Sequence, residues 1–525
     1  MTDHVGAAWR ECEIELVADR EHQDAYSVVD VWAEFTGEDG TTLRRPAFFD
    51  GGRTWRVRFA SPIGAAAWQW TTGASVDDPG LRGVRGTVLI ETSAASNRFE
   101  EHGFWRMSPG ARSLVHADGT PALLVGDTAW ALPWRATCEQ VRVYAADRAA
   151  KGFNAALLMT VQPDMRAAGP RARGVDEGFE VGFDDLPDGR LTRLNPAYFQ
   201  YLDRLTGILL EHGIVPVLQP VFQGYGWKGL GAAGAVVPPE QYARYCRYLV
   251  ARYGARPAIY LVGADGSGQE PQVAAGGAEI HACDCYGQPT GIHYRPHGSN
   301  NAHQDAVWLD FQWCQTGHHG EHVPERVADM WRNTPARAVA NGEPTYERTA
   351  DAWRGAGWWQ GHEAWSNLCA GATMGVVYGA ANLWQWKLHP DEPGHPEVFL
   401  APDGDWRTAL DFEGSTYVGL VGKILDGLPT TDMRPDWDLA MCSRGLSVPG
   451  RLYIAYQEFG GTLQIVRPEE LPRTYHVVDP RTGTVLGSGT LEPGVRTIDD
   501  ERAPAPRVIV FRDEQAQLAR RTTAN

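Results

Sequence analysis

The sequence has little positive charge and no long apolar run. Its 525 residues include 48 Lys and Arg against 65 Asp and Glu, which gives a formal net charge of −17. Because nucleic acids and anionic membranes are bound through an excess of positive charge, we expect neither as a partner. No stretch approaches the ~18 apolar residues that a membrane span requires. The composition is typical of a soluble globular protein.

Cysteine is sparse and scattered, with eight residues in the whole chain. A chain of this length does not depend on disulfides for its stability. The first residues, MTDHVGAAWRECEIELVADRE, lack the basic segment followed by an apolar segment that a secretion signal needs. We therefore expect free thiols and a cytoplasmic location.

Several familiar site motifs are also missing. The histidines between residues 281 and 322 match neither the paired CxxC nor the HExxH zinc pattern, and no P-loop or G-x-S-x-G sequence occurs. GYGWKGLG at 224–231 fits G-x-G-x-x-G, but no helix opens at its end. This favours a mobile active-site loop over a dinucleotide site. We expect no metal and no organic cofactor.

Three segments differ in their apolar patterns. Residues 1–98 alternate apolar and polar positions between turns, as in SVVDVWAEF and GTVLIET, and predict a β-sandwich. Residues 437–525 repeat this pattern and predict a second β-sandwich, whose last residues, QAQLARRTTAN, we expect to be frayed. Between them, residues 99–436 alternate strands with helices such as TCEQVRVYAADRAAKG.

The central segment contains eight expected strands over roughly 300 residues, which indicates an α/β fold of the (β/α)8 TIM-barrel type. A doubly wound sheet is the alternative, although it usually has fewer strands and a phosphate-binding first turn. The expected strands are 122–130, 153–160, 214–222, 258–265, 290–296, 307–317, 336–343 and 375–386.

In such a barrel the chemistry takes place where the strands end. The expected ends carry carboxylates, amides and indoles, and amides and rings of this kind bind polyhydroxylated ligands. The 20 tryptophans of the chain fit this use, although most of them are expected in the core. The candidate substrate contacts are Asp127, Trp130, Gln219, His293, Tyr294, Gln312, Trp313, His318, Glu347, Trp384 and Trp386. For Asp127, a structural hydrogen bond below the mouth is an equal alternative.

Asp265 and Glu343 end the fourth and seventh strands, which face one another across a barrel. Glycoside hydrolysis needs two carboxyl groups that flank the scissile bond. The alternative is that either acid pairs with an arginine or caps a turn. The position of both at strand ends favours a catalytic pair, and Glu347, four residues beyond Glu343, is expected to support it or to bind substrate.

Five stretches together resemble the apiosidase-like family of (β/α)8 glycoside hydrolases. They are LLVGDTAW, LNPAYFQYLDRLTGILLEHGIVPVLQP, RYGARPAIYLVGAD, WLDFQWCQTGH and NGEPTYE, within residues 115–435. The first segment is similar to the small β-sandwich that often precedes such barrels. The last resembles a domain that carries a collagen-binding label, which is a name and implies no activity here.

The resemblance implies that Asp265 is the acid/base and Glu343 the nucleophile. One departure concerns the fourth strand, where the family pattern has Gly-Gly-Asp followed by Arg. Here Ala264 precedes Asp265, and Gly266, Ser267 and Gly268 follow it. The substrate is therefore open, apiose included, and Glu270 is a reserve acid.

These observations predict a hydrolase that removes a terminal sugar, such as an apiose or arabinofuranose furanoside, from short glycosides with retention of configuration. The carbohydrate is then its main partner. Two alternatives remain, a sugar-binding barrel without catalysis and a metal-dependent hydrolase. The sequence leaves the assembly state open, a homo-oligomer included.

Overall fold

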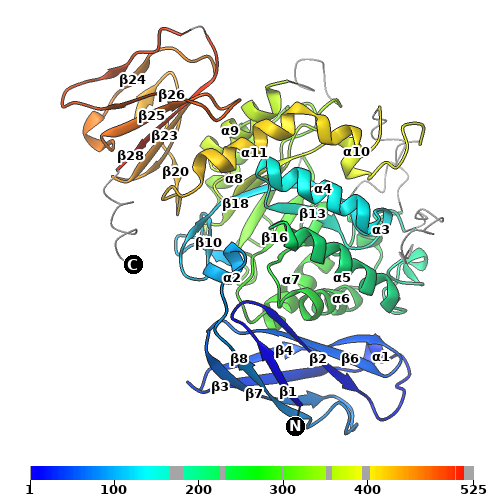
Figure 1. Cartoon of the computed structure of the whole chain (residues 1–525). Coiled ribbons are helices and arrows are strands. Elements are labelled where there is room, and N and C mark those ends of the chain that lie inside the picture. Colours follow the sequence, from blue (N-terminus) through cyan, green and yellow to red (C-terminus); the bar gives the residue numbers. More distant parts are fainter. Residues whose placement is uncertain are drawn as a thin grey trace.

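A closed barrel of eight parallel strands forms the centre of the computed structural model (Figure 1). The structure describes residues 2–165, 181–224, 231–296, 300–349, 357–392, 403–502 and 504–513. The barrel strands are β12 (Leu124–Thr128), β13 (Ala155–Met159), β14 (Val215–Gln219), β15 (Ile259–Gly266), β16 (Thr290–Tyr294), β17 (Phe311–Gln315), β18 (Ala338–Glu343) and β19 (Gly375–Tyr378). The pairing of β12 with β19 closes the ring. All eight predicted strands are confirmed, and closure excludes the doubly wound sheet.

Helices surround this barrel. They are α3 (Leu132–Arg135), α4 (Cys138–Lys151), α5 (Pro196–Glu211), α6 (Pro239–Tyr253), α7 (Pro271–Cys283), α8 (Glu325–Trp331), α9 (Trp359–Ala370), α10 (Ala381–Trp384) and α11 (Glu413–Leu425). Thr137 and Gln140 form a capping box at the start of α4. Asn195 precedes α5, but its amide donates to Val181 O and does not cap the helix. The eighth strand is shorter than predicted, because α10 begins three residues after its end.

Side chains along each barrel strand alternate between two cores. On β12, Leu124 belongs to the core inside the barrel and Val125 to the core between barrel and helices. On β17, Phe311 and Trp313 face inward, whereas Cys314 packs against the α8 side. Successive side chains of a strand point to opposite faces, so only every second residue reaches the barrel interior.

Two sheets precede the barrel (bottom of Figure 1). One has the order β1-β8-β7-β3-β4 and the other β2-β6-β5. Their strands are β1 (Thr2–Gly6), β2 (Glu11–Val17), β3 (Val31–Gly37), β4 (Thr42–Pro46), β5 (Phe48–Gly51), β6 (Thr54–Ala60), β7 (Ala66–Ala74) and β8 (Arg85–Ile90), and the short helix α1 spans Ala25–Val28. Pairs in both sheets are antiparallel except β1 with β8. Trp55, Trp68 and Trp70 are buried between the sheets.

Buried ion pairs attach these sheets to the barrel helices. Arg58 of β6 and Arg252 of α6 both contact Asp203 of α5, at 2.6 Å and 2.8 Å. Arg252 also contacts Asp50 at 2.9 Å. Burial raises the pKa of Asp203, but the two guanidinium groups outweigh it and hold that pKa below its ordinary value. Loss of one partner would leave a buried charge unpaired.

A short antiparallel sheet links the first sheets to the barrel. It follows α2 (Arg98–His102) and consists of β9 (Trp105–Met107), β10 (Leu114–His116) and β11 (Pro121–Ala122). The last part of the chain forms two further sheets, at the top left of Figure 1, with the orders β20-β22-β23-β28-β25-β26 and β21-β24-β27. Their strands are β20 (Arg434–Pro435), β21 (Ala440–Met441), β22 (Arg444–Val448), β23 (Leu452–Gln457), β24 (Leu463–Ile465), β25 (Thr474–Val478), β26 (Val485–Thr490), β27 (Thr497–Ile498) and β28 (Arg507–Arg512).

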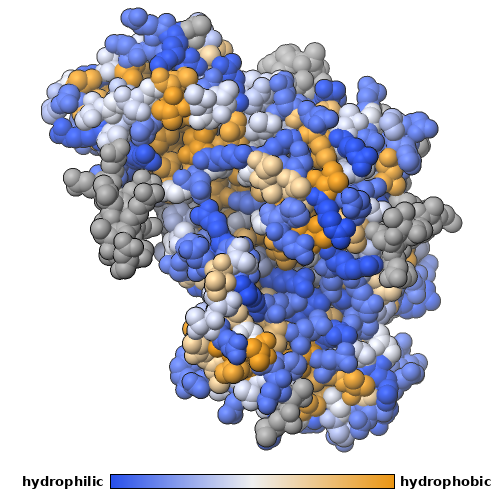
Figure 2. Space-filling model, viewed as in Figure 1, coloured by the Kyte–Doolittle hydropathy of each residue, from blue (hydrophilic) through white to orange (hydrophobic). Residues whose placement is uncertain are grey.

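Figure 2 shows a mostly hydrophilic face, with apolar side chains gathered where the last sheets meet the barrel. Among the described residues, no helix combines the length and the apolar character that a membrane crossing requires. All eight cysteines are free thiols. The domain boundaries at 98/99 and 436/437 stay predictions, and the predicted frayed end, residues 515–525, lies outside the described residues.

Candidate active site

A break in the pairing of β18 decides where Glu343 points. Cys314 pairs with Asn341, but the next residue of β17, Gln315, pairs with Glu343, so Gly342 is an extra residue. Such a bulge re-aims the side chains that follow it. Without it, Glu343 would occupy an outward position of the alternation, like Asn341. With it, Glu343 lies beside the inward-facing Gln315.

Gly342 is also required for space. An added Cβ at this position would lie 1.2 Å from Nε1 of Trp313, the indole that fills the barrel interior below Glu343. The glycine has no left-handed φ, so the absence of a side chain, and not a turn, is what this position needs.

We expect Gly342→Ala to lower both stability and activity. Overpacking of this kind costs about 1–3 kcal/mol. The shift it forces on Glu343 should reduce kcat about 100-fold, because misplacement by ~1 Å has effects of that size. Gly207→Ala in α5, where an added Cβ meets nothing within 4 Å, is the matched control and should keep the activity of the unaltered protein. Thermal denaturation and initial rates measure both effects, and an active Gly342→Ala protein would contradict this account.

Two histidines hold the Glu343 carboxylate. His293 Nε2 lies 3.0 Å from Oε2, and His318 Nε2 lies 3.2 Å from Oε1. The glutamate is 3% exposed. Burial raises its pKa, but the hydrogen bonds and charges of the two histidines outweigh burial and lower that pKa below its ordinary value. On its other side, His293 Nδ1 lies 2.8 Å from Gln219 Nε2, which fixes the ring. Glu343 is therefore held as an ionised carboxylate.

Glu363 of α9 supports the backbone on both sides of this carboxylate. Its carboxylate accepts hydrogen bonds from Thr316 Oγ1 at 2.6 Å and from Thr345 N at 3.1 Å. Thr316 N in turn donates to Glu343 O. Burial raises the pKa of Glu363. The sequence did not predict a role for Glu363, because an acidic residue within a helix gives no local signal of such contacts.

Asp265 lies in an irregular part of β15. Its register against β16 shifts twice between Leu261 and Gly266. Asp265 has a φ of 60°, the left-handed region that L-residues other than Asn and Asp rarely adopt. Its side chain is 4% exposed. A buried acid in a strained backbone at the end of a barrel strand is a feature of functional sites.

A role for Tyr346 was not predicted from the sequence. The ring is fully buried, and its pKa is raised by burial first and then by the negative charges of Glu343 and Asp265. Both carboxylates therefore act electrostatically on this hydroxyl. The ring also lies 4.3 Å from His318, centroid to centroid. The position three residues beyond Glu343 in NGEPTYE was the only signal available.

Aromatic rings form one wall beside the acids. Trp130 contacts Phe222, His293 and Trp384, with ring centroids 5.4, 6.0 and 5.7 Å apart. Trp384 is partly exposed and lies in α10, not at the end of a strand as predicted. Both polar atoms of the Gln162 amide, and Oε1 of Gln315, are buried without a hydrogen-bond partner among the described residues. Such amides are suited to hydroxyl groups of a ligand.

Four predicted contacts do not reach this site, three because they occupy outward positions of barrel strands and Trp386 because it lies after α10. Asp127 pairs with Arg148 of α4 at 2.5 Å, so its role is structural, which was the alternative to substrate binding. Tyr294 donates to Ala302 O, and Gln312 donates to Gln304 Oε1. Trp386 stacks on Trp406 and donates from Nε1 to Gln140 Oε1. Their inward neighbours, such as His293 and Trp313, are the ones at the site.

Glu347 is likewise occupied elsewhere. Its carboxylate accepts hydrogen bonds from the Tyr378 hydroxyl at 2.7 Å and from Gly414 N in the first turn of α11 at 3.1 Å. It is 2% exposed, and burial raises its pKa. An acid at the N-terminus of a helix stabilises that helix. Glu347 therefore joins α11 to the barrel. The reserve acid Glu270 accepts from Ser267 N and Oγ and shapes the loop after Asp265.

We expect Glu347→Gln to lower the free energy of unfolding by about 1–2 kcal/mol, the cost of weakening buried charged hydrogen bonds. Its kcat should stay within about threefold of the unaltered protein, because a contact made equally in ground and transition state leaves kcat unchanged. Thermal denaturation and initial rates on one preparation measure both. A large loss of kcat with unchanged stability would return Glu347 to the catalytic machinery.

In the part of the chain that the structure describes, no three His, Cys, Asp or Glu side chains are grouped so that they could hold a metal ion. Residues 166–180, 225–230, 297–299 and 350–356 lie outside the described residues. The predicted mobile loop at 224–231 falls mostly on one of them. Gly224 itself is close-packed, since an added Cβ would lie 2.2 Å from Asp265 O.

Solved structures with this architecture include proteins that are described as glycoside hydrolases. The chain superposes on a glycoside hydrolase with a TM-score of 0.63 at 18% identity, covering 79% of this chain and 98% of the other. A family 5 glycoside hydrolase from Bacteroides vulgatus gives 0.64 at 19% identity, covering 79% and 94%. A second Bacteroides vulgatus protein, described as a candidate glycoside hydrolase, gives 0.68 at 17% identity, covering 97% and 100%. At these identities the likeness shows the fold.

Sequence families give a narrower result. Residues 6–75 match a domain of unknown function, DUF5060. No curated protein is similar enough to count as a match. Residues 108–432, more than half of the chain, match the model "Apiosidase-like, catalytic domain", and this stretch holds the whole barrel with Asp265 and Glu343. The chain therefore belongs to the apiosidase-like family of glycoside hydrolases.

Proposed function

We propose that this glycoside hydrolase removes a terminal sugar from short oligosaccharides or glycosides, with Glu343 as nucleophile and Asp265 as acid/base. The observation that carries the proposal is the buried Glu343 carboxylate, which His293 and His318 hold in its ionised form. A nucleophile must be ionised at working pH, and the lowered pKa of Glu343 together with its position beside the inward-facing Gln315 supports this role.

In the first step the Glu343 carboxylate attacks the anomeric carbon, and the bond from that carbon to the leaving oxygen breaks. Asp265 donates its proton to that oxygen, so the leaving group departs as an alcohol. The sugar is then bound to Glu343 as an ester. The Tyr346 hydroxyl interacts electrostatically with both acids and is suited to donate a hydrogen bond to Glu343 before the attack.

In the second step Asp265, now a carboxylate, takes a proton from water while the water oxygen attacks the anomeric carbon. The ester bond breaks, and Glu343 is released as a carboxylate. Two displacements return the sugar in its original anomeric configuration. Proton NMR of the first product formed tests this stereochemistry. If the product is the opposite anomer, a base-activated water and not Glu343 attacks the anomeric carbon.

The walls favour a neutral sugar. Trp384, which is partly exposed and packs against the buried Trp130, offers a ring face for C–H groups, and the amides of Gln162 and Gln315 offer partners for hydroxyl groups. Family membership brings apiose into consideration. A five-membered furanoside such as apiose or arabinofuranose is our preferred substrate.

A panel of aryl furanosides and aryl pyranosides tests the proposal, with Glu343→Gln and Glu347→Gln proteins measured beside the unaltered one. We expect release of the aryl group from a furanoside by the unaltered protein and by Glu347→Gln. The Glu343→Gln protein should be inactive. Sugar binding without release in all three proteins would instead support a non-catalytic barrel.

A further inference from the structure

One large cavity among the described residues lies away from the mouth of the barrel. It encloses about 630 Å³ and lies at the opposite end, where Leu123, Asn154 and Gly213 precede β12, β13 and β14. Its other walls come from α2, from the end of α11 and from the last sheets, through Arg451 and Arg512. Cavities of this size at the junction of several chain segments are typical of small-molecule sites.

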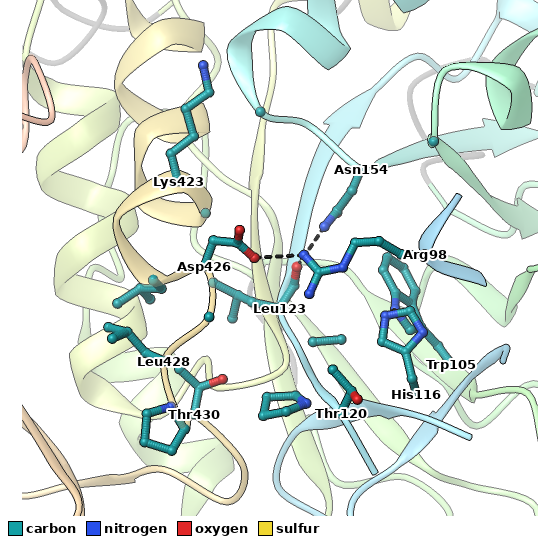
Figure 3. A pocket seen from close by; sticks show the side chains of 18 of the residues that line it. Arg98, Trp105, His116, Thr120, Leu123, Asn154, Lys423, Asp426, Leu428 and Thr430 are labelled. Atoms are coloured by element: carbon teal, nitrogen blue, oxygen red, sulfur yellow. Dashed lines mark hydrogen bonds and ion pairs between the residues drawn. The ribbon is translucent and has the colours of Figure 1, made fainter. Parts of the chain in front are cut away.

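The walls of this base cavity are mainly apolar. Phe99, Phe153, Leu425 and Leu428 contribute to them. Figure 3 shows Trp105 and His116 side by side on one wall and Leu428 and Thr430 on the other. Trp105 Nε1 donates to His116 Nε2 at 3.3 Å, so both polar groups are occupied. The apolar surface suits a hydrocarbon or aromatic body.

The base cavity is lined by more basic than acidic side chains. Four basic side chains line it (Arg98, Lys423, Arg451 and Arg512) against two acidic ones (Asp426 and Asp513). Arg98 reaches across to Asp426 at 2.7 Å, in an exposed pair. Within the described residues, Lys423, Arg451 and Arg512 form no ion pair. Nε of Arg512 is buried without a hydrogen-bond partner there.

Arg451 lies in the turn directly before β23, and Arg512 ends the neighbouring strand β28, so the two residues are close together. Arg512 pairs with Leu452 of β23, the residue that follows Arg451. Two guanidinium groups that have no acidic partner among the described residues favour a carboxylate, sulfonate or phosphate oxygen between them. A neutral sugar is less suited, because it carries no charge to pair with these groups.

We propose that the base cavity binds an amphipathic monoanion, with its apolar body against the leucines and phenylalanines and its acidic group at Arg451 and Arg512. Such a ligand touches α2, the barrel and the last sheets at once, so it stabilises their contact. This site is separate from the proposed catalytic pair and does not depend on it.

Anilinonaphthalene sulfonate, a fluorescent apolar sulfonate, is the probe. We expect saturable binding to the full-length protein, weakened about tenfold by Arg451→Glu and by Arg512→Glu, because a charged hydrogen bond contributes about a factor of ten. Arg473 is exposed, directly precedes β25 and does not line the cavity. Arg473→Glu therefore makes the same change in net charge and should leave binding unaltered. Octanoate should displace the probe, whereas inorganic phosphate at equal concentration should not.

Two results would overturn this site. One is binding that is absent or insensitive to both Arg451→Glu and Arg512→Glu, which would place the probe elsewhere. The other is displacement by phosphate as effective as by octanoate, which would indicate a plain anion site. Hydrolysis measured on the same samples should be unchanged, so failure of this proposal and failure of the catalytic proposal are read separately. Arg451 is exposed, and its replacement should preserve the fold.

Discussion

Replacing Glu343 by Gln is expected to lower kcat by at least about 10³-fold on any glycoside that the protein cleaves. A Gln amide keeps the shape of the side chain but cannot form the ester bond with the anomeric carbon, so the first displacement is lost. The loss of a single residue that acts within a catalytic unit commonly has effects of this size. Initial rates on the best aryl glycoside measure it.

Stability separates this effect from unfolding. The two histidines lose an anionic partner in Glu343→Gln, but the Gln oxygen still accepts one hydrogen bond, so we expect a change in Tm of only a few degrees. Glu347→Gln, four residues along the same segment, is the matched comparison, with the opposite pattern of weakened stability and retained kcat. An external nucleophile such as azide should restore cleavage in Glu343→Ala, where the truncated side chain leaves space for it, and the glycosyl azide should have inverted configuration. Near-normal turnover without azide would refute the assignment.

Replacing Asp265 by Asn is expected to cost about 10²- to 10⁴-fold in kcat, the usual contribution of general acid–base catalysis. The size should depend on the leaving group. Substrates with acidic phenols need little protonation, so their first step should be almost unaffected and the sugar ester should accumulate. Alkyl glycosides should show the full loss. Single-turnover kinetics with the two kinds of substrate measure this difference.

Asn is the informative replacement at this position because it tolerates the left-handed φ of 60° almost as well as Asp. The fold should therefore be preserved, and the loss can be attributed to the missing proton donor. Asp310→Asn is the control. Asp310 is a half-buried acid before β17, at the far end of the barrel, where it accepts from Thr290 N at 3.0 Å and burial raises its pKa to about 6. Equal loss in both variants would argue against a special role for Asp265.

The barrel itself was accessible from local patterns. Each strand is a short run of apolar residues followed by a polar end, and the helix α4 is marked by its capping residues Thr137 and Gly152. These signals depend on near neighbours, so they survive without knowledge of the fold. The boundary of the eighth strand was wrong because the segment after Tyr378 has the same apolar character as a strand, and tertiary contacts make it the helix α10.

The substrate contacts were predicted less well, for one geometric reason. At a strand end, two successive residues are equally polar, and only one of them faces the interior. His293 and Trp313 face inward, whereas Tyr294 and Gln312 support the helix layer. Which residues of a strand face the barrel interior depends on the neighbouring strands in the ring, and no property of the single strand reveals it.

The sequence by itself determined the family, the barrel, and which two acids stand at the ends of opposite strands, because these follow from local patterns and order along the chain. Only the tertiary structure decided that Glu343 faces inward and Glu347 does not. The bulge at Gly342 resets the alternation of β18, and it exists because the indole of Trp313, from the adjacent strand, occupies the space where a side chain would lie. Such a contact between two strands is a property of the closed ring.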